Sequence, residues 1–547
     1  MPASQSQTLR NHIRTVLTLD PQAVAVESNA GQSPLGTSSL PLLLQSPPGT
    51  PPLPLLLQSP PGTSPLPRLQ WRWSELARAA TAIEECLQRA GVEPEMPVGW
   101  VAHNRAAAVA AFISLVANGR MVVPLRPRQS SATLPRELAE QRLKAVIADA
   151  DDWSTEGAVS AARTAGSLGI TLTATPALEV RLVPELAHPG SGPHRPPMPD
   201  YVLERLTSGT TGAPKRIPVL ESVLLPSLRS GEPTAEPGTA AAAESEPPRL
   251  KTSPAILLKP FSHAGGLFGL LLALYQARPM VLMEKFSPEE WAAVIARYAP
   301  KAASLVPAMI QMVLQAGIAP ELLRSLKAIR SGTAPLDVAM QAEFETRYGI
   351  PILIDYGAAE FIGGVAGWTL ADHRQFSSTK RGSVGRARRD VQLKVTSADG
   401  AHELPTGESG ILHIKCERFG PDWIRTNDLA SIDVDGFVFL QGRADDAINR
   451  GGFKILPEEV AAVLRRYPGV RDAAVIGRPD VRLGQVPVAA IEMAPQVPAP
   501  DPAQLEAFAR EHLTAYMIPK EFHFVASLPR TASLKVSRPD LKVMLGL

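Results

Sequence analysis

The sequence predicts an α/β fold, in which a large N-terminal domain of several layers precedes a small C-terminal α+β domain. Apolar, strand-like runs such as MPVGWVA (96–102) and AVIADA (145–150) alternate with helical patterns such as NRAAAVAAFISLVANG (104–119). This alternation favours layers with parallel strands. The 547 residues exceed the size of a single core. The pattern restarts late in the chain, which predicts domains at 1–442 and 443–547.

The first core elements that we expect are a strand and a helix. The strand is AVAVES (23–28), and the helix is WRWSELARAATAIEECLQRAGV (71–92). Ser74 is a suitable residue for the start of that helix, because its hydroxyl can accept a backbone N–H. Apolar residues follow Ser74 at three- and four-residue spacing, which is typical of an amphipathic helix.

A proline-rich repeat separates this strand from this helix. The segment LPLLLQSPPGT at 40–50 recurs at 53–63. Two copies are too few for a solenoid, and the Pro-Pro-Gly steps forbid a continuous helix or a central strand. We interpret 34–66 as a loop insert of the N-terminal domain, in which loop duplication is favoured over an SH3-type ligand. A second insert at 230–252, rich in Ala, Glu and Pro, is expected to be disordered.

The restarted pattern at the end of the chain predicts the small domain. The segment PEEVAAVLRRYPGV (457–470) places Val460, Val463 and Leu464 on one helical face. The segments DAAVIGRPD (472–480) and VPVAAIEM (486–493) are typical of strands.

Composition excludes several functional classes. The formal net charge is +2 with charges spread along the chain, so no basic stripe for nucleic acid is present. Two distant cysteines, Cys86 and Cys416, indicate a reducing compartment without a disulfide framework. The N-terminus lacks the apolar core of a signal peptide. The most apolar stretch is interrupted by Gln276, Arg278 and Pro279 before it reaches membrane-spanning length. We therefore expect a cytoplasmic protein without a membrane span.

The segment LTSGTTGAPKRIPV (206–219) is a candidate phosphate-binding loop. Its glycines allow close approach of the backbone, and successive N–H groups can surround an anion. The P-loop pattern does not fit, because Lys215 stands three residues after Gly212 and not directly after it. A polar surface turn is the alternative for a generic cluster of Gly, Ser and Thr.

The order S-G-T-T-G-x-P-K in this loop resembles the signature of the adenylate-forming superfamily. That superfamily comprises acyl- and aryl-CoA ligases, luciferases and the adenylation domains of peptide synthetases, and this chain is most similar to a fatty-acyl or aryl CoA ligase. The resemblance implies that the loop holds the phosphates of ATP. The residues concerned are Thr207, Ser208, Gly209, Thr210, Thr211, Gly212 and Lys215.

Three further motifs follow in the order that this resemblance requires. The segment DYGAAE (355–360) is similar to Y-G-x-T-E, which implies that Tyr356 and Gly357 border adenine and that Glu360 helps to hold Mg²⁺. The segment TND…GRADD is similar to the T-G-D and G-R-x-D-D motifs. It implies that Asp428 binds the ribose hydroxyls, a role that suits a carboxylate acceptor.

The remaining implied roles lie in the last third of the chain. Arg443 would contact the nucleotide, and Asp445 would be the hinge of a mobile C-terminal domain. The segment LPRTASLKVSR (528–538) is similar to P-R-T-x-x-G-K, which implies that Lys535 is the catalytic lysine of adenylation. An ammonium on a flexible stem can reach the place where negative charge develops.

The chain departs from these motifs at three positions. Ala359 stands where a threonine is usual, so one hydroxyl near the phosphates is missing. Asn427 and Leu534 replace glycines. Asparagine tolerates left-handed backbone geometry better than most residues. No charged group that carries the chemistry is lost.

The acyl pocket is expected around the segments KPFSHAGGLFG (259–269), SGTAP (331–335) and AAEFIGG (358–364). Their small residues indicate a roomy, uncharged pocket. Such a pocket would accept an apolar carboxylic acid, fatty or aromatic. His263 would lie at its mouth, although a lone histidine is often only structural. The expected acyl and CoA pocket comprises His263, Gly265, Gly332, Gly364 and Gly452.

The resemblance implies an AMP-forming acid–thiol ligase that uses ATP, Mg²⁺ and coenzyme A. A carboxylic acid would be activated to an acyl-adenylate and then transferred to the CoA thiol. One alternative is a stand-alone enzyme that loads a carrier protein, since little chain remains after Lys535 for a carrier domain. The other is a non-catalytic nucleotide-binding relative.

Overall fold

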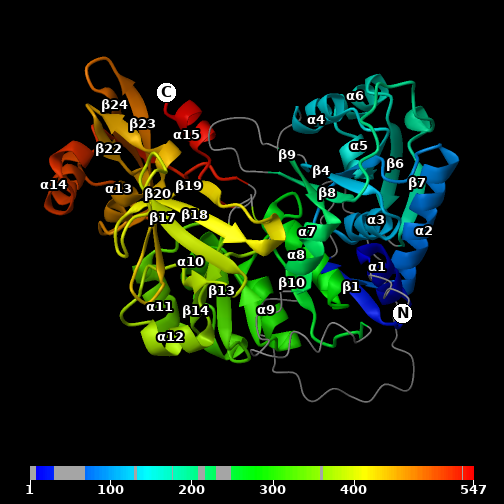
Figure 1. Ribbon diagram of the computed structural model, residues 1–547, viewed down its shortest axis with the longest axis horizontal. Helices are drawn as coiled ribbons and strands as arrows, with labels where there is room; N and C mark the ends of the chain where they lie inside the picture. Colours follow the sequence, from blue (N-terminus) through cyan, green and yellow to red (C-terminus); the bar gives the residue numbers. More distant parts are fainter. Residues whose placement is uncertain are drawn as a thin grey trace.

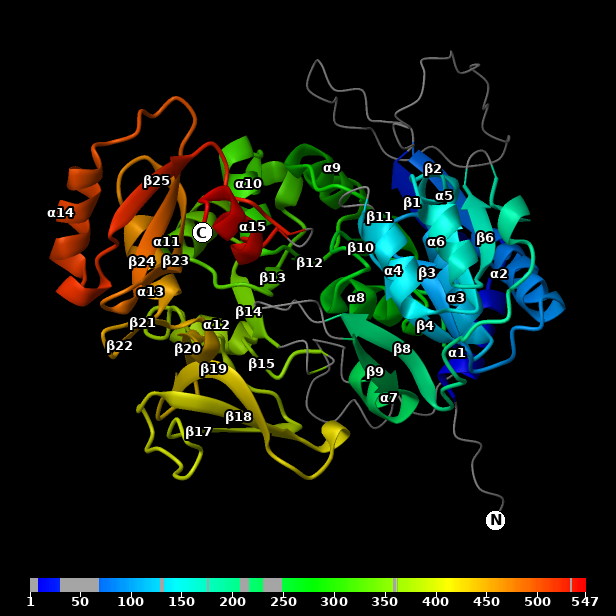
Figure 2. The same ribbon diagram turned by 90° about the horizontal axis from the view of Figure 1, so that it is seen from above.

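The fold consists of a large N-terminal domain of four sheets and a small C-terminal domain at one end of the molecule (Figures 1 and 2). A computed structural model of the protein describes residues 8–29, 68–127, 132–174, 177–206, 216–229, 248–357, 361, 363–531 and 534–547. The predicted mixed α/β class with a large and a small domain is therefore confirmed.

The first sheet has seven strands in the order β7-β6-β5-β3-β4-β8-β9. Its five central strands are parallel, and the two edge strands are antiparallel to their neighbours. The predicted strands at 96–102 and 145–150 are β3 and β5 of this sheet. The strands are β3 (Pro97–Val101), β4 (Met121–Leu125), β5 (Ala145–Asp149), β6 (Leu168–Thr173), β7 (Glu179–Leu182), β8 (Tyr201–Leu206) and β9 (Arg216–Leu220).

Helices cover this sheet. The most deeply placed is α3, in which every side chain is buried because its sequence contains only apolar and small residues. It packs against α2 on one side and the sheet on the other, as expected for a helix that is apolar all round. The helices are α2 (Trp73–Arg89), α3 (Ala106–Ala117), α4 (Thr133–Gln141), α5 (Ala150–Trp153) and α6 (Ala158–Thr164).

The second sheet has the order β10-β11-β1-β2. It corrects the predicted start of the helix at 71–92. Trp71 pairs with Val26 of β1, so Trp71 and Arg72 end a strand and α2 begins at Trp73. The elements are β1 (Val24–Asn29), β2 (Arg68–Arg72), β10 (Ala255–Leu257), β11 (Met280–Leu282), α1 (Leu9–Thr18), α7 (Glu221–Arg229) and α8 (Ala264–Tyr275).

The third and fourth sheets complete the large domain. In the third, β12, β13 and β14 are parallel, and two short antiparallel strands follow. Its elements are β12 (Ala302–Ser304), β13 (Ala328–Gly332), β14 (Ile352–Tyr356), β15 (Ala366–Gly367), β16 (Arg386–Ala387), α9 (Pro288–Tyr298), α10 (Pro307–Ala316), α11 (Val338–Tyr348) and α12 (Leu370–Phe376). The fourth is an antiparallel meander of β17 (Val391–Thr396), β18 (Gly410–Cys416), β19 (Ile424–Ile432) and β20 (Val438–Arg443).

The C-terminal domain contains one sheet, in which the hairpin β23–β24 is the longest pairing. The predicted helix at 457–470 is α13, which buries Val460 and Leu464 while Val463 is half-buried. The elements are β21 (Ile448–Arg450), β22 (Phe453–Ile455), β23 (Val470–Asp480), β24 (Gly484–Met493), β25 (Glu521–Val525), α13 (Pro457–Leu464), α14 (Pro502–His512) and α15 (Arg538–Met544). Short 3₁₀ turns are η1 (Pro184–Leu186), η2 (Pro320–Leu323), η3 (Glu417–Phe419), η4 (Ala444–Asp446) and η5 (Ala515–Met517).

The two expected inserts lie largely outside the described residues. All of 34–66 and most of 230–252 belong to the undescribed part of the chain. At the end of the second insert, the Lys251 N–H donates to the Ala277 carbonyl at 3.0 Å. The domain boundary after Gly442 stays a prediction. Among the helices of the described ranges, none is long and apolar enough to cross a membrane.

A charged cluster joins the first two sheets of the large domain. His103, which follows β3, lies 3.0 Å from Asp152 of α5 through its Nε2 atom. Its Nδ1 atom lies 3.6 Å from Glu284, which follows β11. Arg105 also pairs with carboxylates of both sheets. Its guanidinium lies 2.9 Å from Asp149 at the end of β5 and 2.8 Å from Glu284 after β11. The cluster therefore connects the carboxyl ends of strands from two different sheets.

This cluster predicts a stability that depends on pH through His103. Burial alone would lower the pKa of His103, but the interactions of its ring nitrogens with the carboxylates of Asp152 and Glu284 outweigh it and raise the pKa to about 9. Because this value exceeds the ordinary 6.5, the stabilisation is complete below pH 6.5 and is lost as the pH rises through about 9. At full strength it amounts to about 3 kcal/mol.

We expect His103→Gln to lower the free energy of unfolding at pH 6 by several times more than at pH 9.5, as measured by urea unfolding at both values. His512→Gln, on the exposed face of α14, is the matched control and should show no such difference. An equal loss of stability for His103→Gln at both pH values would contradict the assignment.

Candidate functional site

The structure brings Tyr356, Asp428 and Arg443 together at the junction of the third and fourth sheets. Tyr356 ends β14, and its hydroxyl donates to the Asp428 carboxylate. Asp428 of β19 stands opposite Arg443 of β20 in the strand pairing. The Thr426 hydroxyl fixes the local backbone, because it donates to the Leu412 carbonyl at 2.8 Å and accepts the Asp428 N–H at 3.1 Å. Three residues that the motifs assign to the nucleotide thus share one place.

A hollow in the surface opens beside these residues. It is lined by Phe361, Ile424, Arg425, Thr426, Asn427, Asp428 and Arg443. Phe361 was not expected from the sequence, and it stacks edge-on with Phe419, their centroids being 5.5 Å apart. The hollow combines an apolar wall with a carboxylate and two guanidinium groups, a combination that suits a base and a charged sugar phosphate.

The expected hinge residue Asp445 is held by two neighbours. Arg443 donates to its two carboxylate oxygens at 2.9 and 2.8 Å. The Asn427 amide donates to the same carboxylate at 3.2 Å. These bonds lower the pKa of Asp445, the one from Arg443 first. Asn427, which replaces a usual glycine, therefore provides a side-chain contact to Asp445 that glycine cannot make.

Lys535 from the C-terminal domain lies at the same place. Burial lowers its pKa, the charges of Arg443 and Lys259 lower it further, and the charge of Asp428 opposes them. Lys259 and Asp428 belong to the N-terminal domain and Arg443 ends β20 of the fourth sheet, so Lys535 lies within electrostatic range of the nucleotide residues. The segment before α15 extends from the small domain toward the large one (Figure 2).

Leu534 fixes this segment on the large domain. Its side chain packs against the hydrophobic core that surrounds β13 and β14. Its backbone is left-handed, with φ 62°, which costs a residue that carries a Cβ roughly 1–2 kcal/mol. Leu534 N–H donates to the Thr531 carbonyl at 2.8 Å. The usual glycine at this position would avoid the strain but could not make the contact.

Most of the residues expected at the acyl pocket lie near β14. A Cβ on Gly332 would stand 2.5 Å from the Asp355 carbonyl, and one on Gly357 would stand 2.8 Å from the Gly363 carbonyl. The neighbouring Gly364 touches the Arg388 guanidinium in the same way, at 2.8 Å. These glycines are needed for close packing of the strands and loops around the site.

His263 and Gly265 lie at the start of α8, while Gly452 lies elsewhere. Burial lowers the pKa of His263 to about 4, and the charges of Lys535 and Arg126 act in the same direction. His263 is therefore uncharged at neutral pH and close to Lys535. Gly452 belongs to the β21–β22 turn of the small domain, with no atom within 4 Å of an added Cβ. It does not join the other expected pocket residues in this structure.

Charged side chains stand among these glycines, although the sequence suggested an uncharged pocket. Asp355 of β14 pairs with Arg330 at 3.0 Å and with Arg388 at 2.9 Å. The charge of Asp355 also reaches Lys259, whose pKa is lowered by burial. Sequence reasoning missed this group. The available signal was Lys259, a cation within the otherwise apolar run AILLKPF.

The expected phosphate loop and magnesium ligand lie outside the described residues. These are Thr207, Ser208, Gly209, Thr210, Thr211, Gly212, Lys215 and Glu360, together with Ala359. The ends of the loop are described, since Leu206 of β8 pairs with Arg216 of β9. The loop therefore connects two antiparallel strands. In the described ranges no group of three His, Cys, Asp or Glu side chains could hold a metal.

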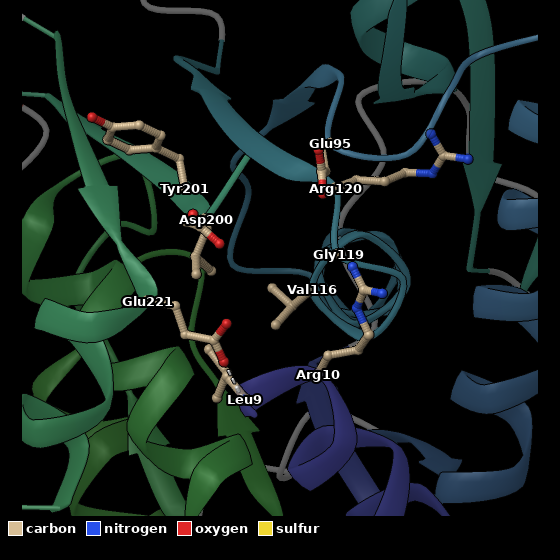
Figure 3. Close-up of a pocket in the computed structure, with 10 residues that line it drawn as sticks. Leu9, Arg10, Glu95, Val116, Gly119, Arg120, Asp200, Tyr201 and Glu221 are labelled. Carbon is tan, nitrogen blue, oxygen red and sulfur yellow. Dashed lines mark hydrogen bonds between the residues drawn. The ribbon is translucent and has the colours of Figure 1, made fainter. Parts of the chain in front are cut away.

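A second hollow, between α1 and β8, has a structural role. Asp200, Tyr201 and Glu221 line one side of it, and Arg10 lies across from them (Figure 3). The Glu221 carboxylate accepts the Leu9 N–H at the start of α1. Its polar groups thus secure the first helix. In both overall views α7 lies between α1 and β19, so this hollow is separate from the nucleotide residues.

Two family profiles match this chain. The profile described as AMP-binding enzyme covers residues 67–418, and the profile described as AMP-binding enzyme C-terminal domain covers residues 459–535. The second of these ranges ends at Lys535, and the first contains the expected phosphate loop and Tyr356.

Curated relatives include two CoA ligases from bacteria. The chain is 31% identical to a 2-succinylbenzoate–CoA ligase of Bacillus pumilus over 302 residues, which cover 52% of this chain and 60% of that one. It is 30% identical to a sulfoacetate–CoA ligase of Cupriavidus necator over 453 residues, which cover 79% and 84%. The aligned part therefore spans less than two thirds of the first of these relatives.

Solved structures share the fold over the whole chain. ATP-bound MatB from Rhodopseudomonas palustris matches with a TM-score of 0.75 and 22% identity, covering 98% of this chain and 99% of that one. The o-succinylbenzoate CoA synthetase from Bacillus subtilis, solved with its acyl-adenylate intermediate, matches with a TM-score of 0.70 and 21% identity, covering 97% of this chain and 98% of that one. At such identity the likeness concerns the arrangement of the elements.

Proposed function

The chain belongs to the family of AMP-binding enzymes, and from this premise we propose that it is an AMP-forming acid–CoA ligase. It activates a carboxylic acid with ATP to an acyl-adenylate and then transfers the acyl group to the thiol of coenzyme A. The names of the related CoA ligases support this reaction. The acid is one with an apolar body, fatty or aromatic.

One observation carries the proposal. Lys535 reaches from the C-terminal domain to Asp428 of the N-terminal domain and to Arg443 at the end of β20, close enough for their charges to shift its pKa. A cation at this point can neutralise the charge that develops when a carboxylate attacks the α-phosphate. Neither domain provides this arrangement by itself, so we assign the present relative position of the domains to the adenylation step.

The remaining roles follow from chemistry. A carboxylate is a poor acyl donor, whereas an acyl-adenylate loses AMP readily, and the protein supplies positioning and charge neutralisation. Asp428 accepts the ribose hydroxyls, and Tyr356 holds Asp428 in place. Thr207, Ser208, Gly209, Thr210, Thr211, Gly212 and Lys215 would hold the phosphates. Glu360 would hold Mg²⁺, which neutralises phosphate charge when bound and commonly uses one or two carboxylates with substrate oxygens.

The acceptor of the acyl group is either CoA or a carrier protein. Both present a thiol at the end of a phosphopantetheine arm, and the similarity to the named CoA ligases favours CoA. The test is pyrophosphate release with ATP, Mg²⁺ and a panel of acids, followed by thioester detection with CoA added or omitted. Pyrophosphate without thioester would indicate a carrier-protein loader. Absence of pyrophosphate with every acid would favour a non-catalytic nucleotide-binding protein.

Leu534 provides a prediction about the balance between the two half-reactions. Leu534→Gly removes backbone strain but also removes the contact with the core around β13 and β14. The strain lies in a turn that is closed within the small domain by the Leu534 N–H and the Thr531 carbonyl, so its removal does not change the balance between domain arrangements. We expect adenylation, measured by ATP–pyrophosphate exchange, to slow by about three- to tenfold, because the lost contact with the large domain, about 1 kcal/mol, shifts the domains away from this arrangement. Thioester formation from a supplied acyl-adenylate should be unchanged or faster.

Leu534→Ala is the matched control for this variant, because it loses the contact and keeps the strain. It should slow adenylation at least as much as Leu534→Gly does. An adenylation rate that rises in both variants would show that the Leu534 contact opposes adenylation, against this interpretation.

A further inference from the structure

The backbone around Lys259 is fixed from two sides. Asn104, which is 6% exposed, donates its amide N–H to the Lys259 carbonyl at 3.0 Å and accepts the Phe261 N–H at 3.0 Å. On the other side, α8 presses against the same turn, since a Cβ on Gly266 would stand 2.1 Å from the Pro260 carbonyl oxygen. The Lys259 side chain therefore leaves the backbone from a well-defined point.

The stem of Lys259 runs toward the expected acyl pocket. Its Cδ atom would contact a Cβ on Gly265 at 3.6 Å, at the start of α8. Its charge acts on Lys535, which places it near the reacting end of the site. The Lys259 side chain is only partly exposed to solvent.

Lys259 forms no ion pair within 4.0 Å with any of the described residues. Asp355 is the one described carboxylate whose charge acts on it, and Asp355 is already shared by Arg330 at 3.0 Å and Arg388 at 2.9 Å. This group of four side chains thus holds three cations and one carboxylate. A partly buried cation without an anionic partner is costly, and a substrate that supplies the anion would recover that cost.

We propose that the acid which this enzyme activates carries a second anionic group, a carboxylate or a sulfonate, and that Lys259 binds it. The inference rests on the proposed ligase function and narrows its substrate class to acids with an anionic group in addition to the reacting carboxylate. Arg330 and Arg388 add to the positive potential but remain paired with Asp355. The body between the two anionic groups can still be apolar.

Matched pairs of acids test the inference. Butanoate is compared with butanedioate, hexanoate with hexanedioate, and propanoate with 3-sulfopropanoate, each by pyrophosphate release at fixed ATP. We expect the doubly anionic acid of at least one pair to have a kcat/KM at least about tenfold higher than its partner in the wild-type protein. In Lys259→Met this preference should fall by about 100-fold, as for loss of one partner of a buried charge pair.

Two further variants keep the test decisive. Lys259→Arg retains the charge and should keep the preference for the doubly anionic acid, which separates charge from packing. Lys285→Met removes an exposed lysine a few residues after β11 and should leave both acids unaffected. The KM for ATP should change less than about threefold in Lys259→Met, because the lysine binds the acid.

Three outcomes would overturn the inference. If Lys259→Met raises the KM for ATP equally with every acid, Lys259 binds phosphate. If the wild type prefers the singly charged acid of every pair and Lys259→Met keeps that ratio, the pocket has no anion site, and the ligase function still stands. If no acid of either kind releases pyrophosphate, the proposed function fails and the inference fails with it.

Discussion

Replacement of Lys535 by alanine is expected to reduce ATP–pyrophosphate exchange by about 10²–10³-fold, the usual cost of removing one group that stabilises charge in a transition state. Lys535 lies near Asp428 and Arg443, where the α-phosphate would acquire charge. Thioester formation from a supplied acyl-adenylate and CoA should continue at close to the wild-type rate, because charge no longer develops there in that step.

Two controls separate chemistry from folding in this experiment. Lys542→Ala removes an exposed lysine from α15 in the same domain and should leave both half-reactions intact. Lys535→Arg keeps a positive charge but presents a planar group, so partial adenylation is expected. Equal loss of both half-reactions in Lys535→Ala, with an unchanged melting temperature, would count against the assigned role.

Much of the fold could be predicted, because the local pattern and the tertiary structure agree there. The strands β3 and β5 and the helix α3 follow directly from short apolar runs and a continuous apolar helix. The start of α2 could not be predicted. Trp71 belongs to a strand because β1 pairs with it across a long insert, and local periodicity contains no information about a partner so distant in sequence.

The candidate site, like the fold, could be predicted only in part. Tyr356, Asp428, Arg443 and Lys535 lie in ordered motifs, and the structure places them together. The grouping of charges around Asp355 could not be predicted, because Lys259, Arg330 and Arg388 are far apart in the chain. The cluster of His103 with Asp152 and Glu284 escaped prediction for the same reason. Only the folded chain reveals such groups, since each residue alone resembles an ordinary surface charge.

Replacement of Asp428 by asparagine is the second change with a large expected effect. The carboxylate can accept both ribose hydroxyls, whereas the amide keeps one accepting oxygen and carries no charge. Hydrogen bonds to charged groups contribute about 1.5–3 kcal/mol, so we expect the KM for ATP to rise by about 10- to 100-fold. Tyr356→Phe, which removes only the hydroxyl that donates to Asp428, should raise it less.

Asp428→Asn should also change the pH dependence of adenylation. The charge of Asp428 raises the pKa of Lys535, against burial and Arg443, which lower it. Adenylation needs the protonated lysine, so the rate falls as the pH rises through that pKa. Loss of the Asp428 charge lowers the pKa of Lys535 further, and the alkaline fall in rate should begin at a lower pH in Asp428→Asn than in the wild type.

Measurement of kcat at saturating ATP from pH 6 to 10 separates this effect from weaker ATP binding. An unchanged alkaline limb, together with a raised KM for the acid in place of ATP, would place Asp428 at the acid and not at the ribose.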